Sequence, residues 1–383
     1  MKIIYILKSF AQLAGTERVM ADKINYLAQK GYSITLITYE QGVHPLAYKL
    51  HPTVKHIDLE TRFFTLQKHS LLTRSFYYIK LKRLFRKKLQ GIVNEQKPDY
   101  IVTTTYSLKV AKDILRAKYN AKTIMESHIN HDSLIKHYEF KKKDINRYFF
   151  LVYDKINKNT LKKYDLFVSL TEKDATQWRM SGIKTKVIPN PVTNYPKEIN
   201  TNKKSNNRII AVGRLNHQKG FDKLIEAFSL ISSKYPEWRI DIYGQGELER
   251  ELNSQIIQKR LEGRVVINQP TKDIYIEYLN SDFLVLSSNF EGFGLVLIEA
   301  MACGIPVVSF DCPYGPNEII TDMKDGILVK NGNVNQLSEK MEWMITHKVE
   351  RTEMGIQARV SAKKYEIKYI MSIWEELFKN KLK

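Results

Sequence analysis

Short apolar stretches alternate along the chain with longer segments in which apolar residues recur every three or four positions. The stretches have the length of buried β-strands, and the longer segments have the period of an α-helix. Buried strands separated by helices predict a parallel sheet with right-handed crossovers. In the first half we expect strands at residues 2–7, Ile34–Thr38, Tyr100–Thr104, Thr123–Glu126 and Leu166–Leu170.

Residues 189–207 interrupt this alternation. Their prolines stand among Asn, Thr and Lys with few apolar residues, which is typical of a linker. The alternation then restarts, with expected strands at Ile209–Val212, Ile240–Tyr243, Val265–Ile267, Phe283–Leu286 and Val307–Ser309. The pattern therefore predicts an α/β protein with two doubly wound, Rossmann-like domains that face each other across a cleft.

We expect an N-terminal domain over residues 1–190, a linker over 191–207 and a C-terminal domain over 208–365. Residues 366–383 form a separate predicted helix, because their apolar side chains are spaced three and four apart. These side chains are Ile370, Ile373, Trp374, Leu377 and Phe378. Such a stripe must pack on another surface, and one possibility is that the helix crosses back to the N-terminal domain.

Composition narrows the class of protein. The hydrophobic fraction of 43% excludes a wholly disordered chain. Two cysteines, Cys303 and Cys312, exclude a disulfide framework and a four-cysteine zinc site. The formal charge is +20, and residues 1–200 carry 36 basic against 17 acidic residues. This excess indicates an acidic partner for the first half, or simply charge that keeps the protein soluble.

The sequence also favours a location. The apolar run after Lys2 is too short for the core of a signal peptide. No stretch of about 18 uncharged apolar residues occurs, so no membrane-spanning helix is expected. We therefore expect a cytoplasmic protein, attached peripherally to the inner face of the membrane.

The most informative motif is a glycine loop that leads into a helix. Gly292 and Gly294 follow an expected strand and precede an expected helix that starts at Leu295. The N–H groups at such a helix start can bind a phosphate. Glu291 lies beside this loop, and Glu299 lies one turn inside the helix. A buried Glu299 needs a partner, either the paired hydroxyls of a ribose or a neighbouring backbone group.

A second motif follows the first strand of the C-terminal domain. Arg214 and Lys219 lie five residues apart in the loop that begins at Gly213. A forked guanidinium and a point-like ammonium can together hold a diphosphate. Basic residues in loops are often merely solvated, but with the glutamate loop in the same domain the motif predicts a nucleotide-diphosphate site.

Together these motifs resemble the retaining nucleotide-sugar glycosyltransferases of family 4, which have the two-domain GT-B fold. The resemblance covers about residues 208–330. It rests on the two glutamates eight apart, Gly213-Arg214 with Lys219-Gly220, Tyr243-Gly244-Gln245-Gly246 and the segment Glu299–Val308. The first half is similar through Gly15-Thr16-Glu17-Arg18 and Glu126-Ser127-His128, although it has Ala14-Gly15 where the family has two glycines.

The resemblance implies roles for the matched residues. Arg214 and Lys219 would stabilise the leaving diphosphate, Glu299 would bind the ribose, and Glu291 would hold a hydroxyl of the donor sugar. His128 would act on the donor sugar from the first domain. The expected catalytic residues are thus Glu291, His128, Arg214 and Lys219, and the expected donor-binding residues are Glu299, Gly294, Leu295, Gly15 and Gly213.

The implied donor is a nucleotide diphosphate sugar, with UDP as the expected nucleotide. No pair of aspartates suitable for a metal is apparent in the sequence. Two cations and a helix dipole can take the place of a metal ion, so we expect no metal and no other cofactor.

Two further regions concern the acceptor. Residues 74–88 contain seven basic and no acidic residues, with Tyr77, Leu81, Leu84 and Phe85 at helical spacing. This pattern predicts a basic amphipathic helix that binds an anionic membrane surface or a lipid diphosphate, unless it is an ordinary helix with core and solvent faces. Residues 136–150 add more basic and aromatic residues.

The combined pattern favours a retaining hexosyltransferase. It would move a hexose or N-acetylhexosamine from a UDP-sugar to a glycan acceptor, lipid-linked through a diphosphate, in bacterial surface glycan synthesis. The segment Asp311–Ile320 resembles the same element in family members with such acceptors. An epimerase or phosphorylase on the same fold is the alternative. A nucleic-acid-binding protein is a more distant one, because no recognised reading module is present and we expect no nucleic-acid partner.

Overall fold

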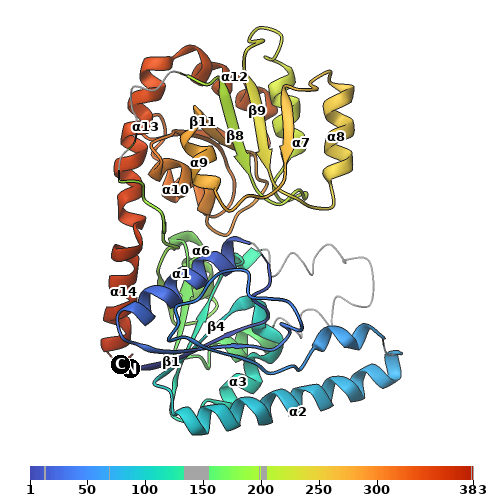
Figure 1. Ribbon diagram of the computed structural model, residues 1–383, viewed down its shortest axis with the longest axis vertical. Helices are drawn as coiled ribbons and strands as arrows, with labels where there is room; N and C mark the ends of the chain where they lie inside the picture. The colour runs from blue at the N-terminus through green and yellow to red at the C-terminus, as the bar shows by residue number, and fades with distance from the viewer. Residues whose placement is uncertain are drawn as a thin grey trace. The chain divides into compact units, whose positions relative to one another are not determined.

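The computed structural model describes residues 1–12, 14–68, 70–132, 155–197, 199, 205–380 and 382. The chain forms two compact units. The first comprises Met1–Pro189 together with Met371–Lys383, and the second comprises Asn190–Ile370. Each unit is built on one parallel β-sheet with helices packed on it (Figure 1). The predicted fold class, α/β with two doubly wound domains, is confirmed.

The sheet of the first unit has the strand order β3-β2-β1-β4-β5-β6-β7, and every pair is parallel. Its strands are β1 (Lys2–Leu7), β2 (Ser33–Thr38), β3 (Lys55–Asp58), β4 (Tyr100–Thr104), β5 (Lys122–Glu126), β6 (Leu166–Ser169) and β7 (Thr185–Val187). The order reverses between β1 and β4. In open sheets of this kind ligands bind at the carboxyl ends of the strands beside such a reversal.

Helices pack on both faces of this sheet. They are α1 (Gly15–Gln29), α2 (Leu71–Gln96), α3 (Ala111–Ala117) and α6 (Glu172–Met180), with the 3₁₀ segments η1 (Phe63–Lys68) and η2 (Thr105–Val110). On one face, Ile4 and Ile6 of β1 join a core with Phe85 and Leu89 of α2. Successive strand residues point to opposite faces, so Tyr5 faces the other side, where Lys23 of α1 is buried.

The last helix is α14 (Ile367–Lys379), and from Met371 onward it belongs to the first unit. The Trp374 and Phe378 side chains are fully buried there. The ring of Phe378 lies 4.9 Å from that of Tyr100, whose hydroxyl donates to the Phe378 carbonyl at 2.9 Å. The apolar stripe read from the sequence is therefore the surface by which the end of the chain completes the first unit.

The sheet of the second unit has the order β10-β9-β8-β11-β12-β13, again all parallel. Its strands are β8 (Arg208–Val212), β9 (Arg239–Tyr243), β10 (Val265–Asn268), β11 (Phe283–Leu286), β12 (Val307–Asp311) and β13 (Ile327–Lys330). Here the order reverses between β8 and β11. The loops after these two strands are therefore the expected place for a ligand.

The helices of the second unit also cover both faces of their sheet (Figure 1). α7 (Phe221–Ser229), α8 (Glu249–Gln258) and α12 (Val334–Thr346) bury their apolar residues against one face. α9 (Ile274–Leu279) and α10 (Leu295–Ala302) lie on the other, with α13 (Lys348–Ala362) packed on α10. Two short pieces, α11 (Pro316–Ile319) and η3 (Lys363–Tyr365), complete the unit.

Within the ranges that the structure describes, every helix is too short or too polar to cross a bilayer.

Candidate functional site

Two loops at the carboxyl edge of the second sheet are bonded into one structure. Residues 213–220 follow β8, and residues 287–294 follow β11. The Asn289 amide donates to the Gln218 carbonyl at 2.8 Å, and the Ser287 hydroxyl donates to the Lys219 carbonyl at 2.9 Å. The Gln218 side chain donates to the Phe290 carbonyl at 3.1 Å. The loops beside the reversal in strand order are thereby held in fixed register.

Glycine is required where these loops come closest. Gly220 has φ +58°, and a Cβ there would lie 2.3 Å from the Ser287 carbonyl oxygen. A Cβ on Gly244, after β9, would lie 1.9 Å from the Gly213 carbonyl oxygen. Both distances are shorter than a Cβ tolerates. Gly220 therefore lets the two loops meet, and Gly244 lets the loop after β9 approach the first of them.

The Lys219 ammonium and the Glu291 carboxylate form an ion pair between the loops. Their Nζ and Oε1 atoms lie 2.6 Å apart, and the Ser288 hydroxyl donates to the same oxygen at 2.6 Å. The side chains are 17% and 7% exposed. A charge-assisted bond at this burial is strong, so it fixes the ammonium and the carboxylate at the edge of the sheet.

Gly213 makes room for this lysine. A Cβ at Gly213 would lie 3.0 Å from the side chain of Lys219, which is tighter than ordinary van der Waals contact. The neighbouring Arg214 is exposed. Its guanidinium has no hydrogen-bond or ion-pair partner in the part of the chain that the structure describes. The lysine is therefore held in place, whereas the arginine is available to an anion.

A third loop contributes Cys312, which follows β12 and is buried. Burial raises the pKa of its thiol well above the ordinary value, and the nearby Glu291 carboxylate raises it further, against the opposing effect of Lys219. Cys312 is thus a neutral neighbour of the ion pair and not a reactive thiolate. Sequence reasoning assigned no role to Ser288 or Cys312, although each stands within two residues of the end of a strand.

The start of α10 lies in the same loop system. Gly294 occupies the N-cap with φ +96°, and Leu295 is the first residue of the helix. The first N–H groups of a helix have no partner within it, so this end can accept an anion.

Glu299, one turn further along α10, is 2% exposed. The hydroxyl of the fully buried Tyr278, from α9, donates to its Oε2 atom at 3.1 Å. The sequence had suggested a ribose or a neighbouring backbone group as the partner of Glu299, and Tyr278 was not foreseen.

The remaining two predicted residues, Gly15 and His128, belong to the first unit. Gly15 is the first residue of α1, and His128 follows β5. The His128 side chain is 2% exposed, with Nε2 at 3.6 Å from the Glu126 carboxylate. The structure thus groups seven of the nine predicted residues in the second unit and two in the first.

Glu126 is part of a buried charged cluster that sequence reasoning missed. Its carboxylate lies 2.5 Å from the Lys23 ammonium, and both side chains are 2% exposed. Lys23 also lies 3.8 Å from the centre of the Trp374 ring. Burial alone would raise the pKa of Glu126, but Lys23 and His128 together lower it below its ordinary value.

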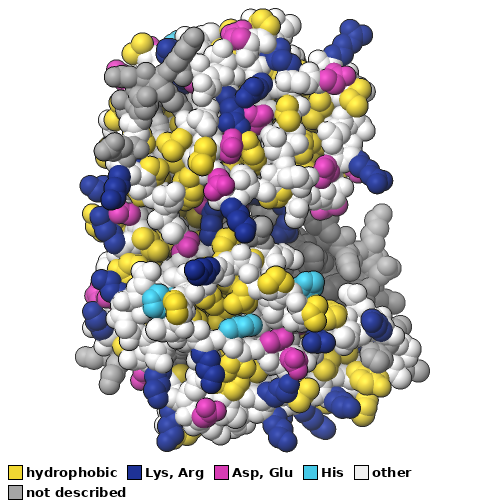
Figure 2. All heavy atoms as spheres, in the orientation of Figure 1, with side chains coloured by type: hydrophobic (Ala, Val, Ile, Leu, Met, Phe, Trp, Pro, Cys, Tyr) yellow, Lys and Arg dark blue, Asp and Glu magenta, His cyan; other side chains and the backbone are white. Residues whose placement is uncertain are grey.

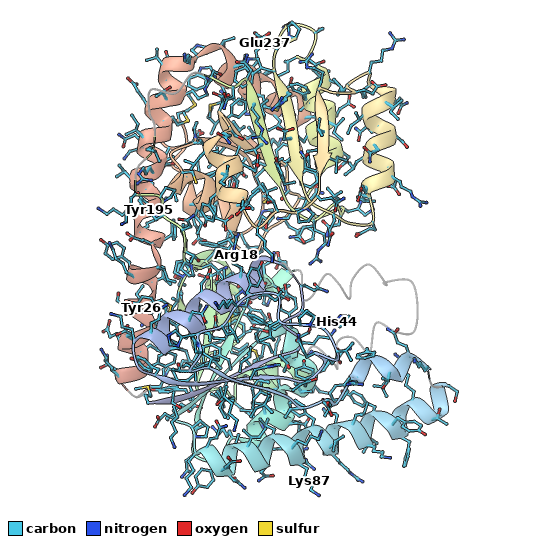
Figure 3. The ribbon with its side chains drawn as sticks, in the orientation of Figure 1. Arg18, Tyr26, His44, Lys87, Tyr195 and Glu237 are labelled. Atoms are coloured by element: carbon cyan, nitrogen blue, oxygen red, sulfur yellow. The ribbon has the colours of Figure 1, made fainter. Side chains whose placement is uncertain are left out.

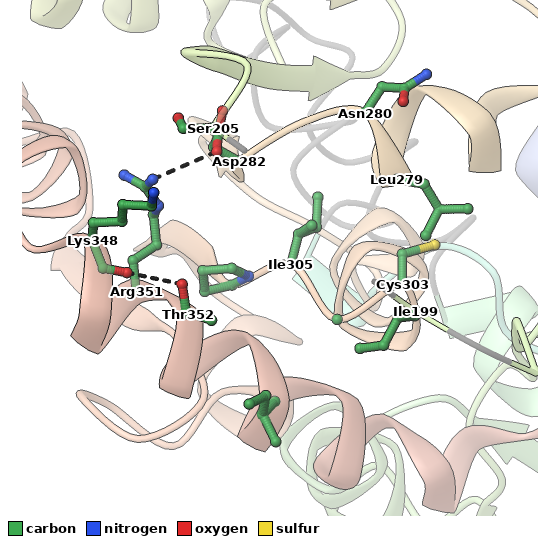
Figure 4. A pocket seen from close by; sticks show the side chains of 13 residues that line it. Ile199, Ser205, Leu279, Asn280, Asp282, Cys303, Ile305, Lys348, Arg351 and Thr352 are labelled. Atoms are coloured by element: carbon green, nitrogen blue, oxygen red, sulfur yellow. Dashed lines mark hydrogen bonds and ion pairs between the residues drawn. The ribbon is translucent and has the colours of Figure 1, made fainter. Parts of the chain in front are cut away.

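A cavity of about 330 Å³ lies elsewhere in the second unit (Figure 4). Its lining includes residues just before three strands, Ser205 before β8, Asp282 before β11 and Pro306 before β12, together with residues of α13. It is therefore at the amino edge of the sheet, opposite the loops that carry Lys219 and Glu291. Ligands of doubly wound sheets bind at the carboxyl edge, so we do not assign this cavity to the donor.

Family models match most of the chain. Residues 13–193 match the model "Glycosyltransferase Family 4", and residues 194–361 match the model "Glycosyl transferases group 1". The chain belongs to the GT-B glycosyltransferases. This membership places the bonded loops of the second unit and the His128 region of the first unit within the two halves of one enzyme fold.

Three relatives illustrate the similarity. An uncharacterised glycosyltransferase of Haemophilus influenzae is 27% identical over 382 residues, which are 98% of this chain and 99% of that protein. A poly(ribitol-phosphate) alpha-N-acetylglucosaminyltransferase of Staphylococcus aureus is 33% identical over 49% of this chain and 37% of its own length. The crystal structure of an S. aureus TarM mutant with UDP is 17% identical, with a TM-score of 0.75 over 99% and 100% of the two chains.

The relatives are transferases, and several are named for bacterial surface polymers. The epimerase or phosphorylase alternative is therefore not favoured, and neither is a nucleic-acid-binding protein.

The predicted basic helix is real but longer than expected. α2 runs over Leu71–Gln96. Two of its basic residues serve the fold, since Lys82 pairs with Asp113 at 2.9 Å and Lys88 donates to the Leu59 carbonyl at 2.8 Å. The apolar residues named from the sequence do not share one environment. Leu81 and Phe85 join the core, whereas Tyr77 and Leu84 are exposed. The second basic segment, 136–150, lies outside the described residues.

The outer face of α2 keeps its charge. Lys80, Arg83 and Lys87 are exposed, and Lys87 points away from the sheet (Figure 3). Lys and Arg side chains gather along the edge of the first unit where α2 runs (Figure 2). The exposed apolar residues Phe76 and Ile79 lie on the same face.

Proposed function

We propose that the protein is a retaining glycosyltransferase that moves a hexose or N-acetylhexosamine from a UDP-sugar to a lipid-linked glycan acceptor in bacterial surface glycan synthesis. The observation that carries the proposal is the Lys219–Glu291 pair, bonded also by Ser288, at the reversal in strand order of the second sheet. The UDP in the related S. aureus structure supports uridine as the base. The surface-polymer transferases among the relatives support the kind of acceptor.

The proposed chemistry follows from the charges that develop on the donor. Breaking the anomeric bond leaves positive charge on the sugar and additional negative charge on the diphosphate. Arg214 would take the diphosphate with its available guanidinium, and Lys219 would stabilise it from its fixed position. Glu291, held by Lys219 and Ser288, would accept a hydrogen bond from a hydroxyl of the transferred sugar. Because Arg214 and Lys219 would stabilise the negative charge on the leaving diphosphate, we propose no metal or further cofactor.

Other residues would bind the donor without acting on the reacting bond. The N–H groups at Gly294 and Leu295 would face a phosphate or the sugar. Glu299 would accept hydrogen bonds from the ribose hydroxyls, in addition to the one from Tyr278. We also propose that His128 acts on the donor sugar and that Gly15 leaves space for the donor at the start of α1.

We propose that the enzyme works at the cytoplasmic face of the membrane, to which α2 attaches it peripherally. Lys80, Arg83 and Lys87 would contact anionic headgroups, and Phe76 and Ile79 would enter the interface between headgroups and acyl chains. Each basic residue near such a surface is worth about 1 kcal/mol.

The test is a titration of UDP, ADP and GDP against the wild-type protein, with a transfer assay beside it. UDP should bind most tightly. Arg214→Ala and Lys219→Ala should each lower turnover by about 10²–10³-fold, and more than they lower donor affinity. Lys324→Ala removes an exposed charge before β13, at the opposite edge of the sheet, and should change neither quantity.

Two results would contradict the proposal. Loss of activity in EDTA that Mg²⁺ restores would show that the two cations do not replace a metal. A product with inverted anomeric configuration in its NMR spectrum would exclude a retaining reaction.

A further inference from the structure

A groove of about 460 Å³ opens at the carboxyl edge of the first sheet. Residues after three strands line it, namely Lys8 after β1, Glu40 after β2 and Lys109 after β4. The remaining lining comes from η1 and the first turns of α2. The groove therefore lies at the reversal in strand order between β1 and β4, where doubly wound sheets bind ligands. None of the predicted donor residues lines it.

The polar lining favours an anion. Three cations, Lys8, Arg74 and Lys109, accompany a single carboxylate, Glu40. Lys8 and Glu40 are 3.3 Å apart and largely satisfy each other. Arg74 and Lys109 are exposed, and among the residues that the structure describes neither side chain has an ion-pair partner. A phosphate group would satisfy both.

The other side of the groove is apolar. Phe63 and Leu66 are each 7% exposed, because they also belong to the core below, and the ring of Tyr78 lies 6.0 Å from that of Phe63. Phe64, which lines the groove, is 50% exposed. The apolar side of the groove therefore includes one strongly exposed ring, that of Phe64.

A ligand that fits both the cationic side and the apolar side of the groove carries a phosphate on an apolar chain. A nucleotide or a free sugar phosphate would occupy the cations but leave Phe64 in water. A hydrocarbon chain attached to the phosphate would cover this ring, and each buried CH₂ contributes about 0.8 kcal/mol. The volume is within the range of about 300–1,000 Å³ that small-molecule sites have.

We propose that this groove binds the phosphate end of a lipid acceptor, with the phosphate between Arg74 and Lys109 and the first carbons of the lipid on Phe64. The inference rests on the proposed transfer to a lipid-linked acceptor and names the part of the chain that would hold it. It assigns Arg74 to the groove, whereas Lys80, Arg83 and Lys87 face the membrane.

The experiment measures binding of farnesyl diphosphate to the full chain without any nucleotide sugar, at concentrations below its self-association. Inorganic diphosphate and farnesol serve as the two half-ligands. Farnesyl diphosphate should bind at least tenfold more tightly than either. Arg74→Ala and Lys109→Ala should each weaken its binding by about tenfold or more, since bonds to charged groups contribute that much. Phe64→Ser should also weaken it by about tenfold or more, because it removes the apolar surface that the hydrocarbon chain covers. Lys112→Ala and Met180→Ala remove an exposed charge and an exposed apolar side chain elsewhere in the first unit, and should leave binding unchanged.

Three outcomes would overturn the proposal. One is unaltered binding in the three groove variants. Another is equal binding of farnesyl diphosphate and inorganic diphosphate, which would show that the groove binds anions but not the lipid chain. The third is an equal effect of the control variants. UDP titration of the same proteins separates this inference from the proposed activity, because none of the proposed donor residues lines the groove. Normal UDP binding with no farnesyl diphosphate binding refutes the groove alone.

Discussion

Two glutamates eight positions apart have different surroundings in the folded chain. Glu291 stands in a loop and bonds with Lys219 and Ser288, whereas Glu299 stands in α10 and accepts from Tyr278. A carboxylate bonded to a fixed ammonium suits a sugar whose charge changes during reaction. A carboxylate bonded to a tyrosine suits a ribose that does not react. At the scale of single residues, the different partners of Glu291 and Glu299 therefore predict different roles for two chemically identical side chains.

Glu299→Ala should weaken UDP binding, and Glu291→Ala should mainly lower turnover while nearly preserving UDP affinity. Calorimetric titration of UDP, combined with kcat from a transfer assay, checks both variants. Glu262→Ala, which removes an exposed carboxylate before β10, is the control. Equal losses of UDP affinity in the two variants would remove this division of roles.

The buried Lys23–Glu126 pair predicts how stability depends on pH. The folded state holds the pKa of Glu126 below its ordinary value of 4.5, so the stabilisation is complete above that value and is lost as the pH falls through the lowered folded pKa. Glu126→Gln should destabilise the first unit at pH 7 by about 3–5 kcal/mol, because it leaves Lys23 unpaired.

Urea unfolding followed by tryptophan fluorescence at pH 7, 5 and 3.5 measures this effect. The difference between the wild type and Glu126→Gln should shrink toward acid pH. The double variant Lys23→Met, Glu126→Gln should recover much of the loss, since it removes the unpaired charge. A difference that does not change with pH would contradict the argument.

At the scale of secondary structure, α2 shows how one basic helix performs several tasks. Its buried face completes the core through Phe85 and Leu89, and Lys82 pairs with Asp113 of the neighbouring helix α3. Its first turns line the groove through Arg74 and its outer face carries the exposed charge. A run of seven basic residues therefore overstates the charge available to a membrane.

Replacing Lys80, Arg83 and Lys87 together by alanine should reduce co-sedimentation with anionic liposomes and slow transfer to a lipid acceptor. UDP binding should not change, because the residues proposed to bind the diphosphate and the ribose lie in the second unit. A triple variant of Lys49, Lys55 and Lys112 removes the same charge from other exposed sites of the first unit.

High salt should have the same effect as the triple variant of Lys80, Arg83 and Lys87, because the Debye screening length falls to about 3 Å at 1 M salt. Equal sedimentation of both triple variants and the wild type would make the outer face of α2 ordinary solvent-exposed charge.

At the scale of the whole molecule, the chain leaves the first unit after Pro189 and returns to it with Met371–Lys383. The returning segment supplies Trp374 and Phe378 to the core of that unit. The first unit is therefore discontinuous in sequence, and its stability depends on the end of the chain.

Phe378→Ala should destabilise the first unit by about 3–5 kcal/mol, the usual cost of such a cavity. Differential scanning calorimetry should show unfolding of the first unit at a lower temperature, while UDP affinity stays unchanged. Asn380→Ala, an exposed position on the same segment, is the control. A variant that melts like the wild type would show that the returning helix adds little to the first unit.

The central strands and the chemical motifs could be predicted from sequence because both are local. A buried parallel strand is apolar on both faces, so β1, β4, β8 and β11 appear as apolar runs. Edge strands have fewer neighbours and less need of apolar residues, so β3 and β7 were missed. β13, at the edge of the second sheet, was missed as well.

The sequence by itself determined the α/β class, the two doubly wound domains and the loops that carry Lys219 and Glu291, because strand period, helix period and glycine loops depend on neighbouring residues. Only the tertiary structure decided which partners these side chains meet. The Lys219 bond to Glu291, the Tyr278 bond to Glu299 and the Lys23–Glu126 pair each join elements that are separated in sequence. Such contacts depend on strand order and packing, and no local pattern of residues encodes them.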